Sequence, residues 1–365
     1  MTLYNYLRFL HFYYGKIMKK LLGSIIIIVA VILGFNFLNR QDKDFKDSLQ
    51  EVHVYSSRKE ELLQDLFEKF TKETGIKVKY IIDEAAQLIN RMENEGEATS
   101  ADVFLTADAV NLILAKKKGL LQPIQSDVLT RAIPSKYRDH DGFWFGLTKR
   151  ARVIVYNKNL VEDKELSTYE HLANRKWKDK ILVRSSSSPY NQSLIAFMIA
   201  NDGIENAKIW IRGLVDNMAR KPSGGDTDQI YAVAAGEGSV AIVNSYYFGR
   251  IIASTKKRDQ AIVEDIGIFF PNQETTGTMI NISGGAVTKN AKNKLNAIKL
   301  LEFLSSKEAQ KVYAQVNQEY PVVQGVELSE VLKSFGPFKE SNLPLQELEK
   351  HLADSVKIAD EEGWK

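Results

Sequence analysis

Apolar and polar positions change their spacing repeatedly between residues 51 and 119. Three short segments alternate or run apolar as β-strands do, and these are residues 51–57, 76–82 and 101–107. Three segments repeat apolar residues at helical spacing, and these are residues 60–75, 84–94 and 111–119. The pattern therefore predicts a βαβαβα succession.

A second series of the same kind begins near residue 150. Its predicted strands are residues 152–157, 180–185 and 239–245. Its predicted helices are residues 167–177, a segment from Pro189 that ends at Gly203, and residues 226–238. The later segment 280–287 (INISGGAV) suits either a crossing strand or a tight turn.

This order of elements predicts an α/β fold of two lobes. Strands that alternate with helices indicate a mostly parallel sheet with helices on both faces. In such sheets, ligands bind beyond the carboxyl ends of the strands. Residues 51–148 form the first predicted lobe, to which the chain returns at about 275–325. Residues 149–274 form the second, completed by about 326–365.

The first 45 residues have the pattern of an export signal. Basic residues precede the uncharged stretch 21–38 (LLGSIIIIVAVILGFNFL), as a positive segment precedes the apolar one in export signals. Met18 is an alternative translation start. The stretch of 18 residues is also long enough to anchor the chain in the membrane. Positive charge on its N-terminal side predicts that the body is exported to the periplasm, free or tethered to the inner membrane.

Charge and cysteine content exclude several classes of function. The net charge is +3, but the first 45 residues contribute +4, so the remainder carries −1. A near-neutral body argues against nucleic-acid binding, which depends on a basic face. The chain has no cysteine, which excludes disulfides, thiolate-bound zinc and thiol catalysis. No nucleophile–base motif is found, and we expect no enzyme.

Three tyrosines stand where the predicted sheet places its ligand site. Tyr190 follows strand 180–185, and Tyr246 and Tyr247 follow strand 239–245. A Tyr-Tyr pair alone is more often explained by packing. Three phenols that converge on one cleft would instead suit a hard trivalent cation, because phenol binds metal only as the deprotonated phenolate. Ferric iron is the cation that fits this donor set.

The sequence also resembles the ferric-iron-binding periplasmic proteins of bacterial ABC transporters. The resemblance covers about residues 51–345, and its most specific blocks are SPYNQSL (188–194) and NSYYFGR (244–250). It also rests on VYSSRKEELLQDLFEKFTKETGIKV, GLTKRARVIVYNK and AIKLLEFLSSKEAQKVYA. The resemblance implies the type 2 periplasmic-binding fold, in which two lobes joined by crossing strands close on the ligand.

The same resemblance implies a set of site residues. Tyr190, Tyr246 and Tyr247 match the family's tyrosinate ligands, and Arg58 and Arg150 match positions that hold a synergistic anion such as carbonate. Several members have His-Tyr after the SSR motif, where this chain has Lys59 and Glu60. Glu60, an anion or water is therefore left to complete the coordination of Fe³⁺.

We thus expect a monomeric solute-binding protein that delivers ferric iron to an inner-membrane ABC permease. Two alternatives remain open at this point. The same fold could bind a small anion or an organic ligand through a clamp of Arg58, Arg150 and Arg152, with the phenols as hydrogen-bond partners. A membrane-tethered sensor or an α/β enzyme would be of a different class.

Overall fold

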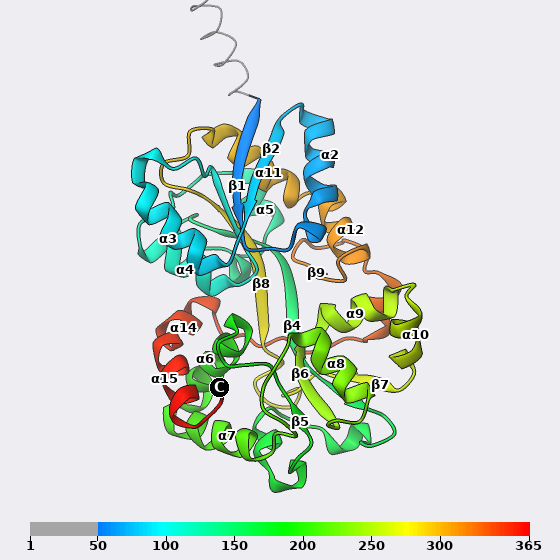
Figure 1. Ribbon diagram of the computed structural model, residues 1–365. Coiled ribbons are helices and arrows are strands. Elements are labelled where there is room, and N and C mark those ends of the chain that lie inside the picture. The colour runs from blue at the N-terminus through cyan, green and yellow to red at the C-terminus, as the bar shows by residue number, and fades with distance from the viewer. Residues whose placement is uncertain (1–49) are drawn as a thin grey trace, which may run out of the picture. The chain divides into compact units, whose positions relative to one another are not determined.

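The computed structural model describes residues 50–365, and Val52–Lys365 form one compact unit (Figure 1). The predicted export segment, residues 1–45, lies outside the described residues. Within the described part, none of the helices combines the length and the apolar character needed to cross a membrane.

One group of elements, here called the first half, lies around the beginning of the chain (Figure 1). Its strands are β1 (Glu51–Ser56), β2 (Lys77–Ile82), β3 (Val103–Thr106) and β9 (Tyr320–Pro321). Its helices are α2 (Gln64–Thr74), α3 (Ala85–Glu95), α4 (Ala109–Lys117), α5 (Asp127–Ala132), α11 (Lys294–Leu304) and α12 (Lys307–Gln315). Short 3₁₀ turns supplement them at η1 (Glu60–Leu62), η2 (Gly96–Ala98) and η3 (Ser135–Tyr137).

The remaining elements form the second half. Its strands are β5 (Ile181–Leu182), β6 (Val240–Asn244) and β7 (Ile266–Phe269). Its helices are α6 (Pro189–Asp202), α7 (Ile204–Asp216), α8 (Asp226–Ala234), α9 (Ser245–Ala253), α10 (Lys257–Val263), α13 (Glu330–Ser334), α14 (Leu345–Lys350) and α15 (Leu352–Glu361). Its 3₁₀ turns are η4 (Asp163–Glu165), η5 (Glu170–Ala173) and η6 (Arg175–Trp177). The helix α14 packs against α4 of the first half as well as against α6.

Two long strands, β4 (Phe145–Asn157) and β8 (Ile280–Val287), run from one half into the other (Figure 1). The early part of β4 pairs with β8 as far as Ala151, and from Arg152 onward it pairs with β6 and, further on, with β7. The strand order is β2-β1-β3-β8-β4-β6-β5. The segment 280–287 is therefore a crossing strand and not a turn.

The prediction of a mostly parallel sheet is wrong. Parallel pairing is found for β1 with β3 and for β5 with β6, whereas β8 and β4 run antiparallel to the strands paired with them. The crossing strands cause the difference, because each enters a half between strands that run the other way. The prediction of an α/β fold with two halves joined by crossing strands is confirmed.

Two predicted elements of the second half differ from the structure. The predicted helix 167–177 is two 3₁₀ turns, η5 and η6, because Asn174 is extended and its side chain accepts a hydrogen bond from the amide of Lys176. The predicted strand 180–185 is only the two residues of β5, which ends the strand order beside β6. The chain then leaves the sheet before the helix that carries Tyr190.

The helix α6 is buried on most of its surface. Six consecutive residues, Leu194 to Ile199, are buried, because α7 and α15 pack against the same helix. Pro189 occupies its first position, where the missing N–H costs no hydrogen bond. The middle of α6 is therefore packed firmly among the helices of the second half.

Candidate functional site

The three tyrosines lie at the starts of two helices. Tyr190 is the second residue of α6, which follows the short strand β5. Tyr246 and Tyr247 lie in the first turn of α9, which follows β6 without an intervening loop. Neighbouring side chains diverge by about 100° in a helix rather than by the 180° of a strand. Two adjacent phenols can therefore share one side of the chain.

The three phenols form one cluster. The rings of Tyr246 and Tyr247 are stacked, with centroids 4.2 Å apart and planes at 29°. The side chains of Tyr246 and Tyr247 interact with each other, and that of Tyr247 also interacts with Tyr190. The structure thus brings together the three residues that the sequence analysis selected as ligands.

Burial keeps the phenols of α9 protonated in the absence of a cation. The pKa of Tyr246 is raised well above its ordinary value by burial and by the neighbouring phenols, with Arg150 opposing the shift. Burial, together with Tyr190 and Asp226, also raises the pKa of Tyr247. A cation that binds here as a phenolate complex must displace these protons.

Two guanidinium groups face the ring of Tyr190. The Cζ atom of Arg150 lies 5.4 Å from the ring centroid, and that of Arg184 lies 5.3 Å from it. Arg150 comes from the crossing strand β4, and Arg184 follows β5. Both distances are within the range of cation–π attraction, which increases when the phenol becomes anionic.

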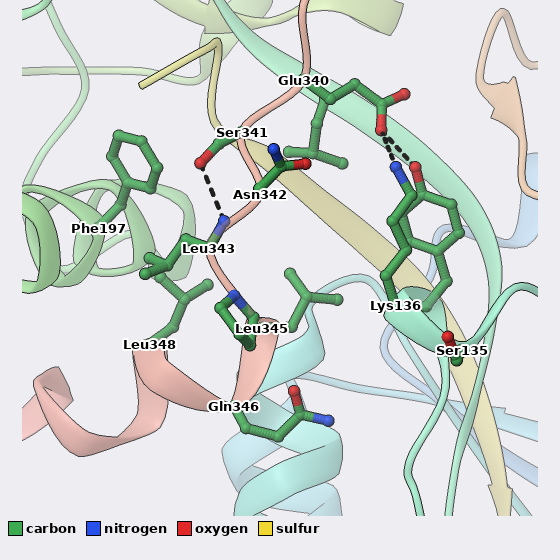
Figure 2. A pocket seen from close by; sticks show the side chains of 13 residues that line it. Ser135, Lys136, Phe197, Glu340, Ser341, Asn342, Leu343, Leu345, Gln346 and Leu348 are labelled. Carbon is green, nitrogen blue, oxygen red and sulfur yellow. Dashed lines mark hydrogen bonds and ion pairs between the residues drawn. The ribbon is translucent and has the colours of Figure 1, made fainter. Parts of the chain in front are cut away.

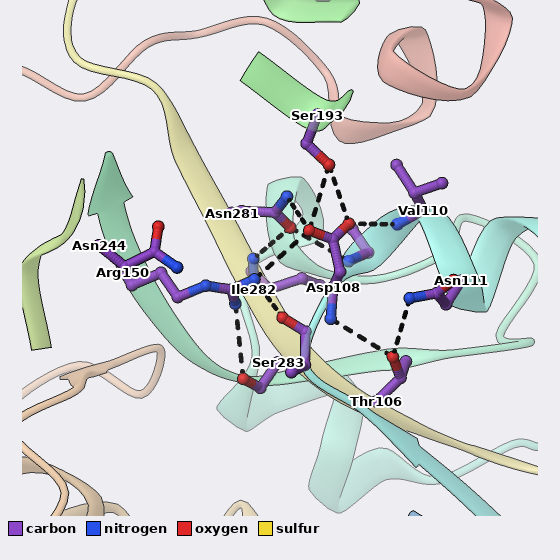
Figure 3. Close-up of polar contacts among 12 residues, drawn as sticks. Thr106, Asp108, Val110, Asn111, Arg150, Ser193, Asn244, Asn281, Ile282 and Ser283 are labelled. Carbon is purple, nitrogen blue, oxygen red and sulfur yellow. Dashed lines mark hydrogen bonds and ion pairs between the residues drawn. The ribbon is translucent and has the colours of Figure 1, made fainter. Parts of the chain in front are cut away.

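Arg150 is buried and already partly bonded (Figure 3). Its Nη2 donates to the carbonyl of Ala107 and lies 3.5 Å from Oδ2 of Asp108, and its Nη1 lies 3.5 Å from Oγ of Ser283. Its Nε is buried without a hydrogen-bond partner. Arg150 therefore retains a free donor beside Tyr190, and the Nε of Arg58 is likewise buried without a partner.

Asp108 joins the two halves at this point (Figure 3). Its side chain caps α4 and accepts hydrogen bonds from Nδ2 of Asn281 at 2.8 Å and from Oγ of Ser193 on α6 at 3.1 Å. Burial raises the pKa of Asp108, and Arg150 opposes the shift. The aspartate thus connects the first half, the crossing strand β8 and the helix that begins with Tyr190.

Arg58 lies with its charge neutralised by a glutamate. Its Nη2 is 2.6 Å from Oε2 of Glu319 and its Nη1 is 3.3 Å from Oε1, which is a forked ion pair. Nη1 also lies 3.4 Å from Oγ1 of Thr148. Arg58 and Tyr246 interact electrostatically, so the pair borders the phenol cluster.

Glu60, the predicted carboxylate ligand, lies in the exposed turn η1. Its Oε1 accepts a hydrogen bond of 2.5 Å from the hydroxyl of Tyr80. Lys59 precedes it and is also exposed. The side chain is already bonded to Tyr80, and its binding to a metal stays a prediction.

The space beside the arginines is very small. A cavity of about 10 Å³ is lined by Asp108, Arg150, Arg152, Tyr190, Asn244, Met279 and Asn281. Pockets for organic ligands measure about 300–1,000 Å³. The volume at this place is therefore far below what an organic molecule requires.

A larger cavity, of about 290 Å³, shares none of these residues (Figure 2). Glu340 lies at its wall and accepts hydrogen bonds from Lys136, Tyr137 and Lys149. Lys149, through charge and hydrogen bonding, lowers the pKa of Glu340 against the opposing effect of burial. The carboxylate of Glu340 already accepts hydrogen bonds from three side chains. It is therefore not available to bind a polar ligand in this cavity.

The described residues offer no other metal site of the common kind. Residues 50–365 contain no group of three or more His, Asp and Glu side chains close enough to hold an ion. The phenol cluster is thus the candidate site that oxygen-donor chemistry supports in this part of the chain.

Sequence reasoning missed several residues of this region. Asp108, Glu319 and Asp226 are buried acids that neutralise the arginines, and Arg184 contacts Tyr190. Only Arg184 carries a local signal, since it stands just before the SSSSPY segment. The acids are brought near by the fold from distant positions.

Comparison with known proteins gives a consistent result. Residues 56–311 match the family model of the bacterial extracellular solute-binding protein. The chain is 45% identical to Iron uptake protein A1 of Synechocystis sp. over 357 residues, which is 96% of this chain and 99% of that protein.

Two solved structures are similar to the whole described unit. A Trichodesmium protein in complex with iron and citrate ligands is 51% identical, with a TM-score of 0.82 over 86% of this chain and 100% of that one. The ferric binding protein from Campylobacter jejuni is 43% identical, with a TM-score of 0.83 over the same shares.

Proposed function

Since the chain belongs to the bacterial extracellular solute-binding protein family, whose members bind solutes and are not enzymes, we propose that its solute is ferric iron. In this proposal, Tyr190, Tyr246 and Tyr247 bind the metal as phenolates. Relatives that are named for iron uptake or ferric-iron binding support this choice of solute.

The observation that carries the proposal is the cluster of the three phenols Tyr190, Tyr246 and Tyr247. Each phenol loses one proton on binding, so three phenolates balance the charge of Fe³⁺. Oxygen donors of this kind suit hard cations. The guanidinium groups of Arg150 and Arg184 lie 5.4 Å and 5.3 Å from the centroid of the Tyr190 ring, so both positive charges are close to this proposed ligand.

Three phenolates occupy half of an octahedron, so other donors complete it. We propose a small anion such as carbonate beside Arg150, whose Nε has no partner in the structure. Arg58 is less suited to this role, because Glu319 already takes its forked hydrogen bonds. Glu60 is the alternative donor, and its use requires release from Tyr80.

The protein would then act in the periplasm as the binding component of an ABC importer. It would capture ferric iron between its halves and deliver it to an inner-membrane permease. The alternative, binding of an organic anion by an arginine clamp, is disfavoured by the cavity of about 10 Å³ and by the pairing of Arg58 and Arg152 with acids.

A visible absorption spectrum tests the proposal. Purified iron-free protein is titrated with a ferric salt, and we expect a phenolate-to-iron charge-transfer band that saturates at one equivalent. A protein that stays colourless while it binds an organic anion would contradict it.

A further inference from the structure

The phenols belong to two separate helix starts that must keep a fixed spacing. Tyr190 begins α6, whereas Tyr246 and Tyr247 begin α9. The two helices start from neighbouring strands, β5 and β6, which pair over only two residues each. Such short pairing is a weak restraint on the distance between the phenols, and a side-chain contact between the two starts would add to it.

The buried side chain of Arg152 makes that contact. Its Nη2 donates to Oδ1 of Asn191, the neighbour of Tyr190, at 2.7 Å. Its Nη1 donates to Oδ1 of Asn244, two residues before Tyr246, at 3.3 Å. The residue is 3% exposed, so water does not compete for these bonds.

Each of the two asparagines that Arg152 joins makes further hydrogen bonds. Nδ2 of Asn191 donates to the carbonyls of Arg184 at 2.9 Å and Ser185 at 3.1 Å, in the loop that leads to α6. At the other end, the amide of Asn244 donates to Oδ2 of Asp226 at 2.7 Å. A displacement of either helix start would therefore break several hydrogen bonds.

Asp226 completes the arrangement and supplies the opposite charge. Its Oδ2 also lies 2.7 Å from Nη1 of Arg152, and its Oδ1 lies 3.5 Å from Nη1 of Arg184. Without this carboxylate, Arg152 would be a buried charge with no counter-ion, which is strongly unfavourable. The acid and the arginine thus act as one unit.

We propose that Arg152, held by Asp226, is a positioning residue that fixes the spacing of the two tyrosine-bearing helix starts before a ligand arrives. Its role is indirect, because its Nη atoms are already bonded to Asn191, Asn244 and Asp226. The consequence for iron rests on the proposed function above, but the spacing of the helix starts does not.

Arginine suits this task because its planar group offers several donors in fixed directions. A lysine keeps the charge but presents a single nitrogen, which cannot bridge Asn191, Asn244 and Asp226 in the same geometry. Residues that orient metal ligands in this way typically change metal affinity by about 10- to 100-fold when they are replaced.

The first test measures amide hydrogen exchange of the iron-free protein. In Arg152→Met, we expect faster exchange both at the start of α6 and at the start of α9. Asn217→Ala is the matched control, because Asn217 is a buried amide of the second half that bonds to the carbonyls of Leu172 and Asn174. Faster exchange at neither start or at only one, or an equal change in the control, overturns the proposal.

The second test is a ferric titration with a double-mutant cycle. We expect Arg152→Met to weaken iron binding by about 10- to 100-fold and to shift the charge-transfer band, with Arg152→Lys only partly restoring both. Because Arg152 acts through Asn191, the change Asn191→Ala should reduce iron affinity less in the Arg152→Met background than in the parent protein. Full restoration by lysine, or strictly additive effects, overturns the proposal.

The two tests separate this inference from the proposed function. If the parent forms no iron band, the proposed function fails, while the exchange experiment still decides the positioning role. If the parent binds iron and Arg152→Met binds it equally well, the positioning role alone is refuted.

Discussion

Arg58 and Glu319 are 261 positions apart in the chain and form a buried, forked ion pair, with Nη2 and Oε2 2.6 Å apart. Both side chains are almost fully buried, at 3% and 2% exposure. Glu319 raises the pKa of Arg58 against the opposing effect of burial, so the guanidinium remains charged. The pair fastens the turn after β1 to the segment before β9.

We expect Glu319→Gln to destabilise the protein by about 3–5 kcal/mol, because it leaves the charge of Arg58 buried without a partner. Urea unfolding of the iron-free protein measures this. Glu308→Gln breaks the exposed pair with Lys69 and should change the free energy of unfolding by about 0–1 kcal/mol. If the two changes lower the free energy of unfolding equally, the buried pair stabilises the protein no more than the exposed pair does.

Replacement of each proposed ligand by phenylalanine should weaken ferric binding and reduce the charge-transfer band. The variants are Tyr190→Phe, Tyr246→Phe and Tyr247→Phe, and each should lose more iron affinity than the about 10- to 100-fold typical of an indirect effect. Tyr320→Phe is the control, since that phenol is also buried but makes no hydrogen bond in the structure. If two of the three variants bind ferric iron with the same affinity as the parent, the assignment of the tyrosines as ligands is wrong.

The donor that completes the coordination can be identified by its dependence on the medium. With an anion beside Arg150, iron affinity should rise with added carbonate, and Arg150→Ala should abolish that rise. With Glu60 as the ligand, affinity should ignore carbonate and fall in Glu60→Gln. Ferric titrations in carbonate-free and carbonate-containing buffer measure both dependences. Carbonate-independent binding by the parent would end the anion proposal.

Acid should release the iron. The pKa values of Tyr246 and Tyr247 are raised in the iron-free protein, so protons compete with the metal and win as the pH falls. A pH titration of the charge-transfer band measures the release. A band that persists unchanged at low pH would show that phenolates do not bind the metal.

The same raised pKa predicts a loss of stability in alkali. A group whose pKa is raised by folding stabilises the protein below its unfolded pKa, about 10 for tyrosine, and loses this contribution as the pH rises further. For each such phenol, the free energy of unfolding should fall by about 1.4 kcal/mol per pH unit above about pH 10. Denaturant unfolding at pH 10 and 11 should therefore show a smaller loss for Tyr246→Phe than for the iron-free parent.

The sequence allowed the fold and the three phenols to be predicted because both depend on local patterns. Tyr246 and Tyr247 follow an apolar strand directly, and Tyr190 follows Pro189 at a helix start. The partners of the arginines could not be predicted in this way. Glu319 and Asp226 lie in segments whose own pattern indicates only a loop end and a helix start, and their burial depends on tertiary packing.

The crossing strand β4 changes partners between Ala151 and Arg152, so its backbone belongs to both halves at once. Arg150 and Arg152 stand on either side of that point, and alternate residues of a strand face the same way. A twist of the backbone here would swing one half away from the other and would carry the two guanidinium groups apart in the same movement. Since both arginines line the small cavity beside Tyr190, such a twist would also change the surroundings of that tyrosine.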